Sequence, residues 1–206
     1  MIVLVRHGET ENAKGKAIGH TDLQLSSTGN IQAQMLAESL KGVKFKTFLT
    51  SPLTRTMQTA AYIEKSCRIT PTPRAELMEI NLGKWDGLSY HKIKEKFPDE
   101  YAKRGQDFAG YRPPDGENFM DLKKRIKSFL DEFSKKQQPA LIITHAGVIR
   151  IFMHLVLGFP LENIFCIKPS HCHVTIMTDS PSGYILKAFN LPYGPDLSLA
   201  FREAMP

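Results

Sequence analysis

The chain has 206 residues, 42% of them hydrophobic and 23% charged, which is typical of a soluble globular protein and predicts a single domain over residues 1–206. Lys and Arg outnumber Asp and Glu by 27 to 21, for a formal charge of +6, a balance that fits an anionic substrate and fits nucleic acid less well. The three cysteines form an odd set without CxxC spacing, which argues against a disulfide framework or a zinc site and indicates a reducing compartment.

Short apolar runs alternate with helical patterns in the first third of the chain. Residues 2–5 predict a strand that runs directly into Arg6, His7 and Gly8. This run is too short for a signal peptide, so we expect a cytoplasmic protein. A helix capped by Ser26 or Ser27 is expected next, with one apolar face made of Ile31, Met35, Leu36 and Leu40.

A second strand and a second helix are predicted to follow. Residues 45–50 read as the strand, which ends in Ser51 and Pro52. Pro52 lies near the start of the helix, whose apolar positions are Met57, Ala60, Ala61 and Ile63.

Residues 80–116 differ from the rest because they are rich in Lys, Glu, Gly and Pro. We expect a lid-like helical insertion and loop here, within the same domain. A long amphipathic helix is predicted from Glu117 onward, with apolar positions at Phe119, Leu122, Ile126, Phe129 and Phe133.

The last third opens with a predicted strand at residues 140–144, which enters His145, Ala146 and Gly147. Residues 148–157 are apolar on nearly all sides, which predicts a buried helix. The longer stretch 141–158 is the best candidate for a membrane span, but His145, Gly147, Arg150 and His154 interrupt it, so no membrane partner is expected. Residues 174–178 and 184–188 predict a closing pair of strands joined by a turn at 180–183.

The alternation of strands and helices predicts an α/β fold, a three-layer sandwich with a mostly parallel central sheet, helices on both faces and a small helical lid insertion. Ligands bind beyond the carboxyl ends of strands in such sheets. Three predicted strands end in reactive or charged residues: Arg6 and His7, then Thr50 and Ser51 with Arg55 one turn later, then Thr144 and His145.

Two histidines and two arginines are therefore expected to converge on one pocket. Arginine guanidinium groups match phosphate oxygens in bidentate fashion, and a neutral histidine can attack phosphorus. For His7 to be the nucleophile, one ring nitrogen must donate to an acceptor that fixes the tautomer. We expect Arg6, Arg55 and a protonated His145 to offset the charge of a phosphate ester.

The leaving alcohol of such an ester needs a proton, and Glu76 and Glu79 are the candidate donors. If residues 75–80 are extended, their spacing of three puts the two side chains on opposite faces. Only one of them can then face the pocket, and the sequence leaves open which one does.

Four blocks in order, LVRHGET, SPLTRTMQTA, ELMEINLGKWDG and ITHAGV, resemble the histidine phosphatase superfamily, also called the phosphoglycerate mutase-like fold. The resemblance covers about residues 1–190. It implies that His7 is phosphorylated, that Glu79 donates the proton, and that Arg6, Arg55 and His145 bind the phosphoryl group. It also implies that neither a metal nor another cofactor is needed.

Within this superfamily, the stretch Gly19 to Asp22, the loop 112–118 and the tail 165–178 look most like the alpha-ribazole phosphatases of cobalamin assembly. The resemblance implies a phosphomonoesterase acting on a small-molecule phosphate ester, with alpha-ribazole 5'-phosphate as a candidate. A broad-specificity phosphatase or a phosphoglycerate mutase of the same fold is the alternative, although true mutases usually carry a larger insertion. A non-catalytic phosphate-binding or nucleic-acid-binding module is the competing class, and we expect no nucleic acid partner because aromatic and basic residues are not interleaved.

Several positions stay open. Asn12 either contacts the phosphate or is shifted away, because the loop after Glu11 is one residue shorter than is common in the family. Thr21 either touches phosphate or serves a turn. His171 and His173 would share one face of a strand and resemble a metal site, but no third ligand is evident, which favours a substrate-side wall or plain surface. The oligomeric state is open, a homodimer included.

Overall fold

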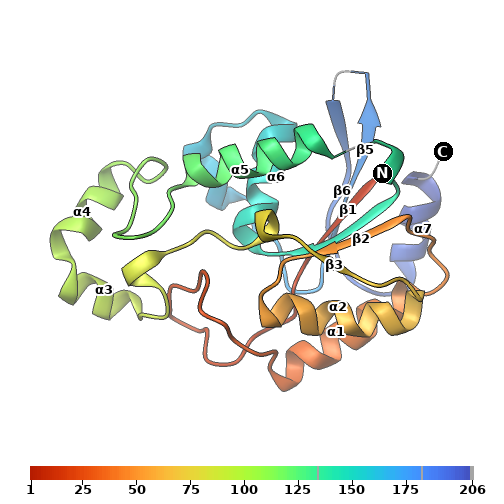
Figure 1. The fold of residues 1–206 in the computed structure, drawn as a ribbon, viewed down its shortest axis with the longest axis horizontal. Coiled ribbons are helices and arrows are strands. Elements are labelled where there is room, and N and C mark those ends of the chain that lie inside the picture. The colour runs from red at the N-terminus through yellow and green to blue at the C-terminus, as the bar shows by residue number, and fades with distance from the viewer. Residues whose placement is uncertain (134, 182, 205–206) are drawn as a thin grey trace.

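A six-stranded sheet in the order β3-β2-β4-β1-β5-β6 runs through the computed structural model, which describes residues 1–133, 135–181 and 183–204 (Figure 1). The strands are β1 (Ile2–Arg6), β2 (Thr47–Thr50), β3 (Thr72–Pro73), β4 (Ala140–Thr144), β5 (Val174–Ser180) and β6 (Gly183–Leu191). β3, β2, β4 and β1 are mutually parallel, whereas β5 and β6 are antiparallel to their neighbours.

Helices cover both faces of this sheet. Helices α5 (Phe119–Glu132) and α6 (Ala146–Leu157) lie on one face, and α1 (Ser27–Ser39), α2 (Thr54–Cys67) and α7 (Pro195–Ala204) lie on the other (Figure 1). Side chains alternate along β1 accordingly: Ile2 and Leu4 join the core under α5 and α6, and Val3 and Val5 join the opposite core. The predicted α/β sandwich with a mostly parallel sheet is confirmed.

The carboxyl ends of three parallel strands meet at one edge of the sheet. Arg6 on β1 pairs with Thr144 on β4, and Thr50 on β2 pairs with Ile143. The ladder continues one step further, because the His7 amide donates to the Thr144 carbonyl at 3.0 Å. This register brings the three predicted strand ends together.

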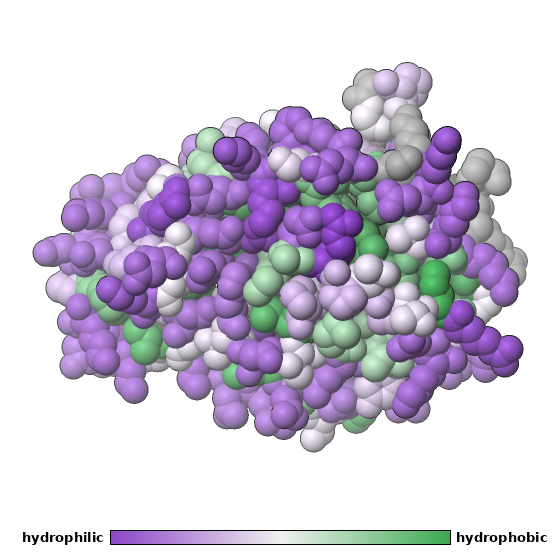
Figure 2. Space-filling view, in the orientation of Figure 1, coloured by the Kyte–Doolittle hydropathy of each residue, from purple (hydrophilic) through white to green (hydrophobic). Residues whose placement is uncertain are grey.

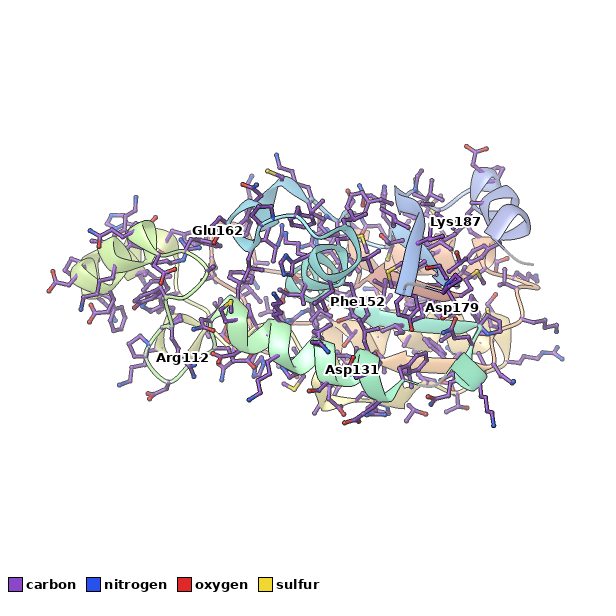
Figure 3. The ribbon with its side chains drawn as sticks, turned by 90° about the horizontal axis from the view of Figure 1, so that it is seen from above. Arg112, Asp131, Phe152, Glu162, Asp179 and Lys187 are labelled. Carbon is purple, nitrogen blue, oxygen red and sulfur yellow. The ribbon has the colours of Figure 1, made fainter. Side chains whose placement is uncertain are left out.

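The segment between residues 80 and 116 forms short helices that project from one end of the sheet (Figure 1). These are α3 (Tyr90–Lys96) and α4 (Pro98–Gln106), and they share a small core built on Ala17, Trp85 and Ile93. Backbone hydrogen bonds between Ala17 and residues 87 and 88, at 2.8 and 2.9 Å, tie this segment to the loop after β1. Seen from above, Arg112 lies toward this end and Lys187 toward the opposite end (Figure 3).

Four short 3₁₀ helices complete the described elements: η1 (Ala75–Leu77), η2 (Gly83–Trp85), η3 (Lys135–Gln137) and η4 (Leu161–Cys166). Hydrophilic residues dominate the face shown in Figure 2, with hydrophobic ones scattered between them. Within the described residues, no helix has both the length and the apolar character that crossing a bilayer requires.

Helix α1 buries only part of the face expected, because Leu36 and Leu40 are buried as predicted but Ile31 and Met35 are not. Ser26 is its N-cap, but Ile31 and Met35 are 58% and 49% exposed. The buried face consists largely of small residues, with Gly29, Ala33, Leu36 and Ala37 turned inward. Small side chains fit here better than large ones because the loop after β1 passes close to the helix: a Cβ atom on Gly29 would overlap the Glu9 carbonyl oxygen.

Other boundaries differ by a few residues from those expected. β2 begins at Thr47 rather than residue 45, and α2 begins at Thr54, after Pro52, with Ala61 exposed. The short edge strand β3 and the C-terminal helix α7 are not among the predicted elements. The predicted helix from residue 119, the buried helix α6 and the pair β5 and β6 are confirmed.

The close approach at Gly29 can be tested against a second helical glycine. Gly29→Ala should destabilise the protein by about 1–3 kcal/mol, because the added methyl group overpacks a contact with backbone. Gly105→Ala in α4 is the matched control, because nothing lies within 4 Å of the position that its added methyl group would occupy. The control should be neutral or stabilising by up to about 1 kcal/mol. Equal urea midpoints for the two variants would contradict this packing.

Candidate active site

His7 stands at the end of β1 and is only 6% exposed. Its Nδ1 lies 2.7 Å from the Gly8 carbonyl oxygen, which can only accept, so Nδ1 carries the proton and donates. Nε2 therefore keeps its lone pair. Burial, then the charges of Arg6 and Arg55, hold the pKa of His7 well below its usual 6.5. The ring is thus a neutral imidazole in a defined tautomer.

Arg55, in the first turn of α2, is 2% exposed and bonds only to neutral acceptors. Its terminal nitrogens donate to the Gly19 carbonyl at 2.7 Å and the Thr21 carbonyl at 2.9 Å. The same loop caps α2, because Asp22 accepts from the Thr54 amide at 2.8 Å and from its hydroxyl at 2.6 Å. The loop thereby fixes both the helix start and the direction of the guanidinium group.

Arg6 is the second buried cation at this strand end. One terminal nitrogen donates to the Pro169 carbonyl at 2.9 Å, and its buried Nε has no partner among the described residues. Burial lowers the pKa of Arg6 to about 10, against the opposing effect of Glu79. No described carboxylate lies within ion-pair distance of Arg6 or Arg55. Two desolvated guanidinium groups without counterions favour an anionic ligand.

His145 caps the N-terminus of α6, and its ring lies 5.1 Å from the His7 ring. Arg55 Nε can only donate, so His145 Nδ1 accepts its hydrogen bond at 3.3 Å, and Nε2 lies 2.8 Å from Ser51 Oγ. Burial, followed by Arg55 and His7, holds the pKa of His145 well below 6.5. Without a bound anion, burial and the adjacent Arg55 therefore disfavour the protonated His145 that was expected beside a phosphate ester.

Glu79 faces the pocket and Glu76 does not. The Glu79 carboxylate accepts from the amides of Ile80 at 3.0 Å and Gly147 at 3.1 Å, at the N-terminus of α6. A Cβ atom on Gly147 would collide with the Glu79 carboxylate, so any other residue there would force that carboxylate to shift. Glu76 instead forms an ion pair with Arg74 at 2.6 Å. The 3₁₀ turn at Ala75–Leu77 replaces the extended segment on which the spacing prediction depended.

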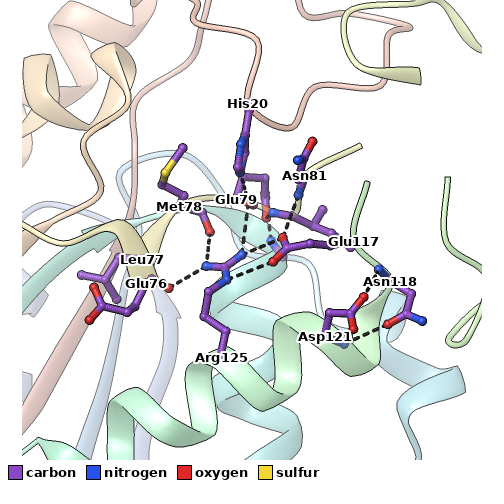
Figure 4. Close-up of polar contacts among 12 residues, drawn as sticks. His20, Glu76, Leu77, Met78, Glu79, Asn81, Glu117, Asn118, Asp121 and Arg125 are labelled. Carbon is purple, nitrogen blue, oxygen red and sulfur yellow. Dashed lines mark hydrogen bonds and ion pairs between the residues drawn. The ribbon is translucent and has the colours of Figure 1, made fainter. Parts of the chain in front are cut away.

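Arg125 on α5 holds the backbone that carries Glu79 (Figure 4). It donates to the carbonyls of Glu76 at 2.6 Å and Met78 at 2.9 Å, and it forms a two-pronged ion pair with Glu117 at 2.9 and 3.2 Å. Glu117 also accepts from the Asn81 amide at 2.9 Å. This pair is not predicted from the sequence, because Arg125 sits in the polar stripe of an ordinary amphipathic helix.

A cavity of about 710 Å³ opens over these groups. Its walls include Arg6, His7 and Arg55, which were proposed from the strand ends, and also Glu79. His145, the other strand-end histidine, is fully buried behind them and is not among the lining residues. An adjoining cavity of about 350 Å³ shares Arg6 and Glu79 with it and extends toward the insertion. The two cavities form one cleft. The part lined by His7 and Arg55 is its histidine end, and the part lined by Arg104 and Arg150 is its far end.

Asn12 and Thr21 lie in different environments. Asn12 lines the histidine end of the cleft, on a backbone with a positive φ of 55°. Thr21 does not line it: its hydroxyl donates to Asp86 at 2.6 Å. Of the two roles left open for Thr21, these contacts favour the turn role, in which its carbonyl orients Arg55.

His171 lies in a turn that precedes β5 rather than on a strand, so the expected shared face with His173 does not form. The His171 ring lies 5.6 Å from the His7 ring and lines the cleft, whereas His173 packs against Tyr193. Burial and Arg6 lower the pKa of His171 to about 3. No group of three or more potential metal ligands occurs among the described residues.

Two further arginines of the cleft went unrecognised in the sequence. Arg104 on α4 and Arg150 on α6 both line its far end. Arg150 could have been found, because it is the one formally charged residue in an otherwise apolar helix. Arg104 sits in a run of exposed charges and gives no such signal.

The lowered pKa values predict a specific loss of stability in acid. Below about pH 6.5 the unfolded chain protonates its histidines while His7, His145 and His171 stay neutral in the folded protein. Stability is therefore fully present above this pH and falls as the pH is lowered. His171→Gln should reduce the loss between pH 6.5 and 5 by about 1–2 kcal/mol, measured by urea unfolding. His91→Gln, at an exposed position of α3, should leave the loss unchanged. If the unfolding free energy fell equally steeply with pH in the parent and in both variants, the burial argument would be contradicted.

Comparison with known proteins finds a matching family model and several similar sequences. A model of the histidine phosphatase superfamily (branch 1) matches residues 2–192. The chain is 33% identical over 184 residues to a 6-phosphofructo-2-kinase/fructose-2,6-bisphosphatase of Arabidopsis thaliana, covering 85% of this chain but only 24% of that protein. It is 30% identical over 162 residues to the adenosylcobalamin/alpha-ribazole phosphatase of Escherichia coli K12, covering 77% of this chain and 80% of the relative.

A solved structure shows the same fold. The crystal structure of the alpha-ribazole phosphatase from Shigella flexneri superposes with a TM-score of 0.85 at 26% identity, over 92% of this chain and 95% of that one.

Proposed function

This chain belongs to the histidine phosphatase superfamily, and we propose that it is a phosphomonoesterase that passes the phosphoryl group of a small ester through Nε2 of His7 to water. One observation carries the proposal: the unprotonated Nε2 of a buried neutral imidazole faces a cleft beside two guanidinium groups that have no carboxylate partner among the described residues. A phosphate dianion supplies the missing negative charge.

In the first step, the His7 Nε2–phosphorus bond forms as the bond from phosphorus to the alcohol oxygen breaks. Arg6 and Arg55 stabilise the charge on the phosphoryl oxygens. Glu79, carrying a proton, gives it to the departing alcohol oxygen. A dianion next to Arg55 also favours a proton on His145 Nδ1, which then donates to a phosphoryl oxygen in place of accepting from Arg55.

In the second step, water attacks phosphorus and the bond to Nε2 breaks. The Glu79 carboxylate accepts a proton from the water, which restores its starting state, and inorganic phosphate leaves. The Arg125–Glu117 pair keeps Glu79 in place throughout, because Arg125 holds the carbonyl groups of Glu76 and Met78, just before it in the chain. Asn12, at the cleft wall, is proposed as a further phosphate contact.

The names of the relatives suggest candidates for the alcohol part. Alpha-ribazole 5'-phosphate, in cobalamin biosynthesis, is one candidate, supported by the alpha-ribazole phosphatases among the relatives. A sugar bisphosphate is another, supported by the fructose-2,6-bisphosphatase similarity. We also propose a single cytoplasmic domain with a lid-like insertion at about 80–116. A screen of phosphorylated metabolites would rank the candidate substrates by kcat/KM.

Two other functions make different predictions. A mutase would interconvert 3- and 2-phosphoglycerate faster than it hydrolyses either one. A non-catalytic module would bind nucleic acid in a salt-sensitive way with His7 dispensable. Buried groups converging on one cleft favour the phosphatase over the binding module.

The nucleophile can be tested directly. His7→Ala should lower kcat for a generic aryl phosphate by at least about 10³-fold, because the covalent route is lost. His91→Ala in α3 is the matched control and should retain parental turnover. With labelled substrate and an alkaline denaturing quench, only proteins with His7 should retain a phosphoryl adduct, and later acid treatment should release it. If His7→Ala turned over the aryl phosphate at the parental rate, the proposed role of His7 would be contradicted.

The two glutamates give a second paired test. Glu79→Gln should lower kcat by about 10²–10⁴-fold for alcohol leaving groups, because it cannot donate or accept the proton. The loss in kcat/KM should be much smaller for p-nitrophenyl phosphate than for an alkyl ester, because kcat/KM reports the first step, in which p-nitrophenolate leaves without protonation. Glu76→Gln should change kcat by less than about twofold, and a reversed ranking would reassign the acid.

A further inference from the structure

Two arginines at the far end of the cleft lack the carboxylate partner that other arginines of this chain have. Arg104 and Arg150 line the cavity of about 350 Å³, whose walls include neither His7 nor Arg55. Arg74, Arg112 and Arg125 each pair with a carboxylate. Among the described residues, Arg104 and Arg150 have no such partner within ion-pair distance.

Aromatic rings hold both guanidinium groups in place. Arg104 lies 4.4 Å from the centroid of Phe108, and Arg150 lies 4.7 Å from that of Phe165. The two phenyl rings meet edge to face at 4.7 Å, so the four side chains form one continuous stack. Arg150 Nε also donates to the Ile167 carbonyl at 2.8 Å. Stacking and this bond leave the terminal nitrogens of Arg150 available to a ligand.

The acidic residues of the same cavity do not neutralise this pair. Glu79 accepts from the backbone amides of Ile80 and Gly147, and Glu117 is occupied by Arg125 and the Asn81 amide. Burial lowers the pKa of both Arg104 and Arg150, which shows that water solvates them poorly. Desolvated cations without a counterion are costly to a fold unless a ligand provides the charge.

Unpaired hydrogen-bond donors lie in the same wall. Trp85 is 3% exposed, and its Nε1 has no partner among the described residues. The buried hydroxyl of Tyr111, whose ring stacks on Trp85 at 5.3 Å, is also unpartnered there. An indole N–H can only donate, so it adds to the demand for an oxygen acceptor.

We propose that Arg104 and Arg150, stacked on Phe108 and Phe165, form a second anion site, so that the preferred substrate is a phosphate ester whose alcohol part carries another oxyanion, either a phosphate or a carboxylate. This inference rests on the proposed phosphatase activity and narrows its substrate. The scissile phosphate occupies the His7 end of the cleft, and the second anion occupies the far end. Glu79 and Arg6, which line both cavities, lie at the junction where the leaving oxygen would be.

The test compares esters that differ only in the second anion. The carboxylate pair is 3-phosphoglycerate against glycerol 3-phosphate. The phosphate set is fructose 2,6-bisphosphate and fructose 1,6-bisphosphate against fructose 6-phosphate. Alpha-ribazole 5'-phosphate, which lacks a second anion, and an aryl phosphate complete the panel. We expect kcat/KM to favour the doubly anionic member of at least one set by tenfold or more, and that set identifies the anion.

Variants assign this preference to the arginines. Arg104→Gln and Arg150→Gln should reduce the preference ratio to within about twofold of unity, and Arg104→Lys should keep part of it because the charge remains. Arg112→Gln removes an equal charge at the same end of the molecule (Figure 3), from an exposed ion pair outside the cleft, and should keep the parental ratio. Thermal melting checks that each variant is folded.

The outcomes separate this inference from the activity on which it rests. Hydrolysis of the aryl phosphate without a preference in either set would overturn the second anion site alone. So would a preference that persists in both glutamine variants, or alpha-ribazole 5'-phosphate exceeding every doubly anionic ester by tenfold. A parent protein that hydrolyses no ester in the panel would overturn the phosphatase proposal and the inference with it.

Discussion

The architecture of the site depends on the environment of one imidazole. His7 is buried next to two cations and donates its only proton to the carbonyl of the following residue. An imidazolium there would lie beside Arg6 and Arg55, which makes the charged form unfavourable. Burial and this repulsion together keep the ring neutral. No described carboxylate lies within ion-pair distance of either guanidinium group. A single arrangement of charges thus prepares both a nucleophile and a receptor for an anion.

Holding uncompensated charges in place requires a rigid frame, and the sheet edge provides it. β1 and β4 are paired along their whole length, so His7 and His145 emerge at the same level. The loop that contains Gly19 and Thr21 accepts the hydrogen bonds of Arg55, and Asp86 in turn accepts from that loop. Gly29 allows the segment after His7 to press against α1. Each contact joins residues that are distant in sequence, so the site is a property of the assembled fold.

The cleft has two chemically distinct ends. Fixed cations and a neutral histidine form the end that suits phosphoryl transfer, while aromatic rings with stacked arginines form the end proposed to contact the rest of the substrate. The insertion carries Arg104 and meets η4 through Phe108 and Phe165, while α6 carries Arg150 and also presents Gly147 to Glu79. In the proposed function, the second anion site and the proton donor therefore share helix α6.

Local patterns were sufficient for every strand of the sheet except the short edge strand β3, and for the strand-end residues. Short apolar runs identified β1 and β4, and the polar residues just after them marked the site, because parallel strands align their carboxyl ends whatever the details of the loops. The choice between Glu76 and Glu79, the turn role of Thr21 and the neutral state of His145 depended on contacts made only after folding: the Arg74 pair, Asp86 and Arg55. In the sequence, Arg125 and Arg104 look like surface cations. Only the packed structure shows that Arg125 contacts the Glu79 segment and that Arg104 lines the cleft. Sequence encodes periodicity and chain direction locally, whereas the charge state and the partners of a buried group are set by residues that the tertiary structure brings together.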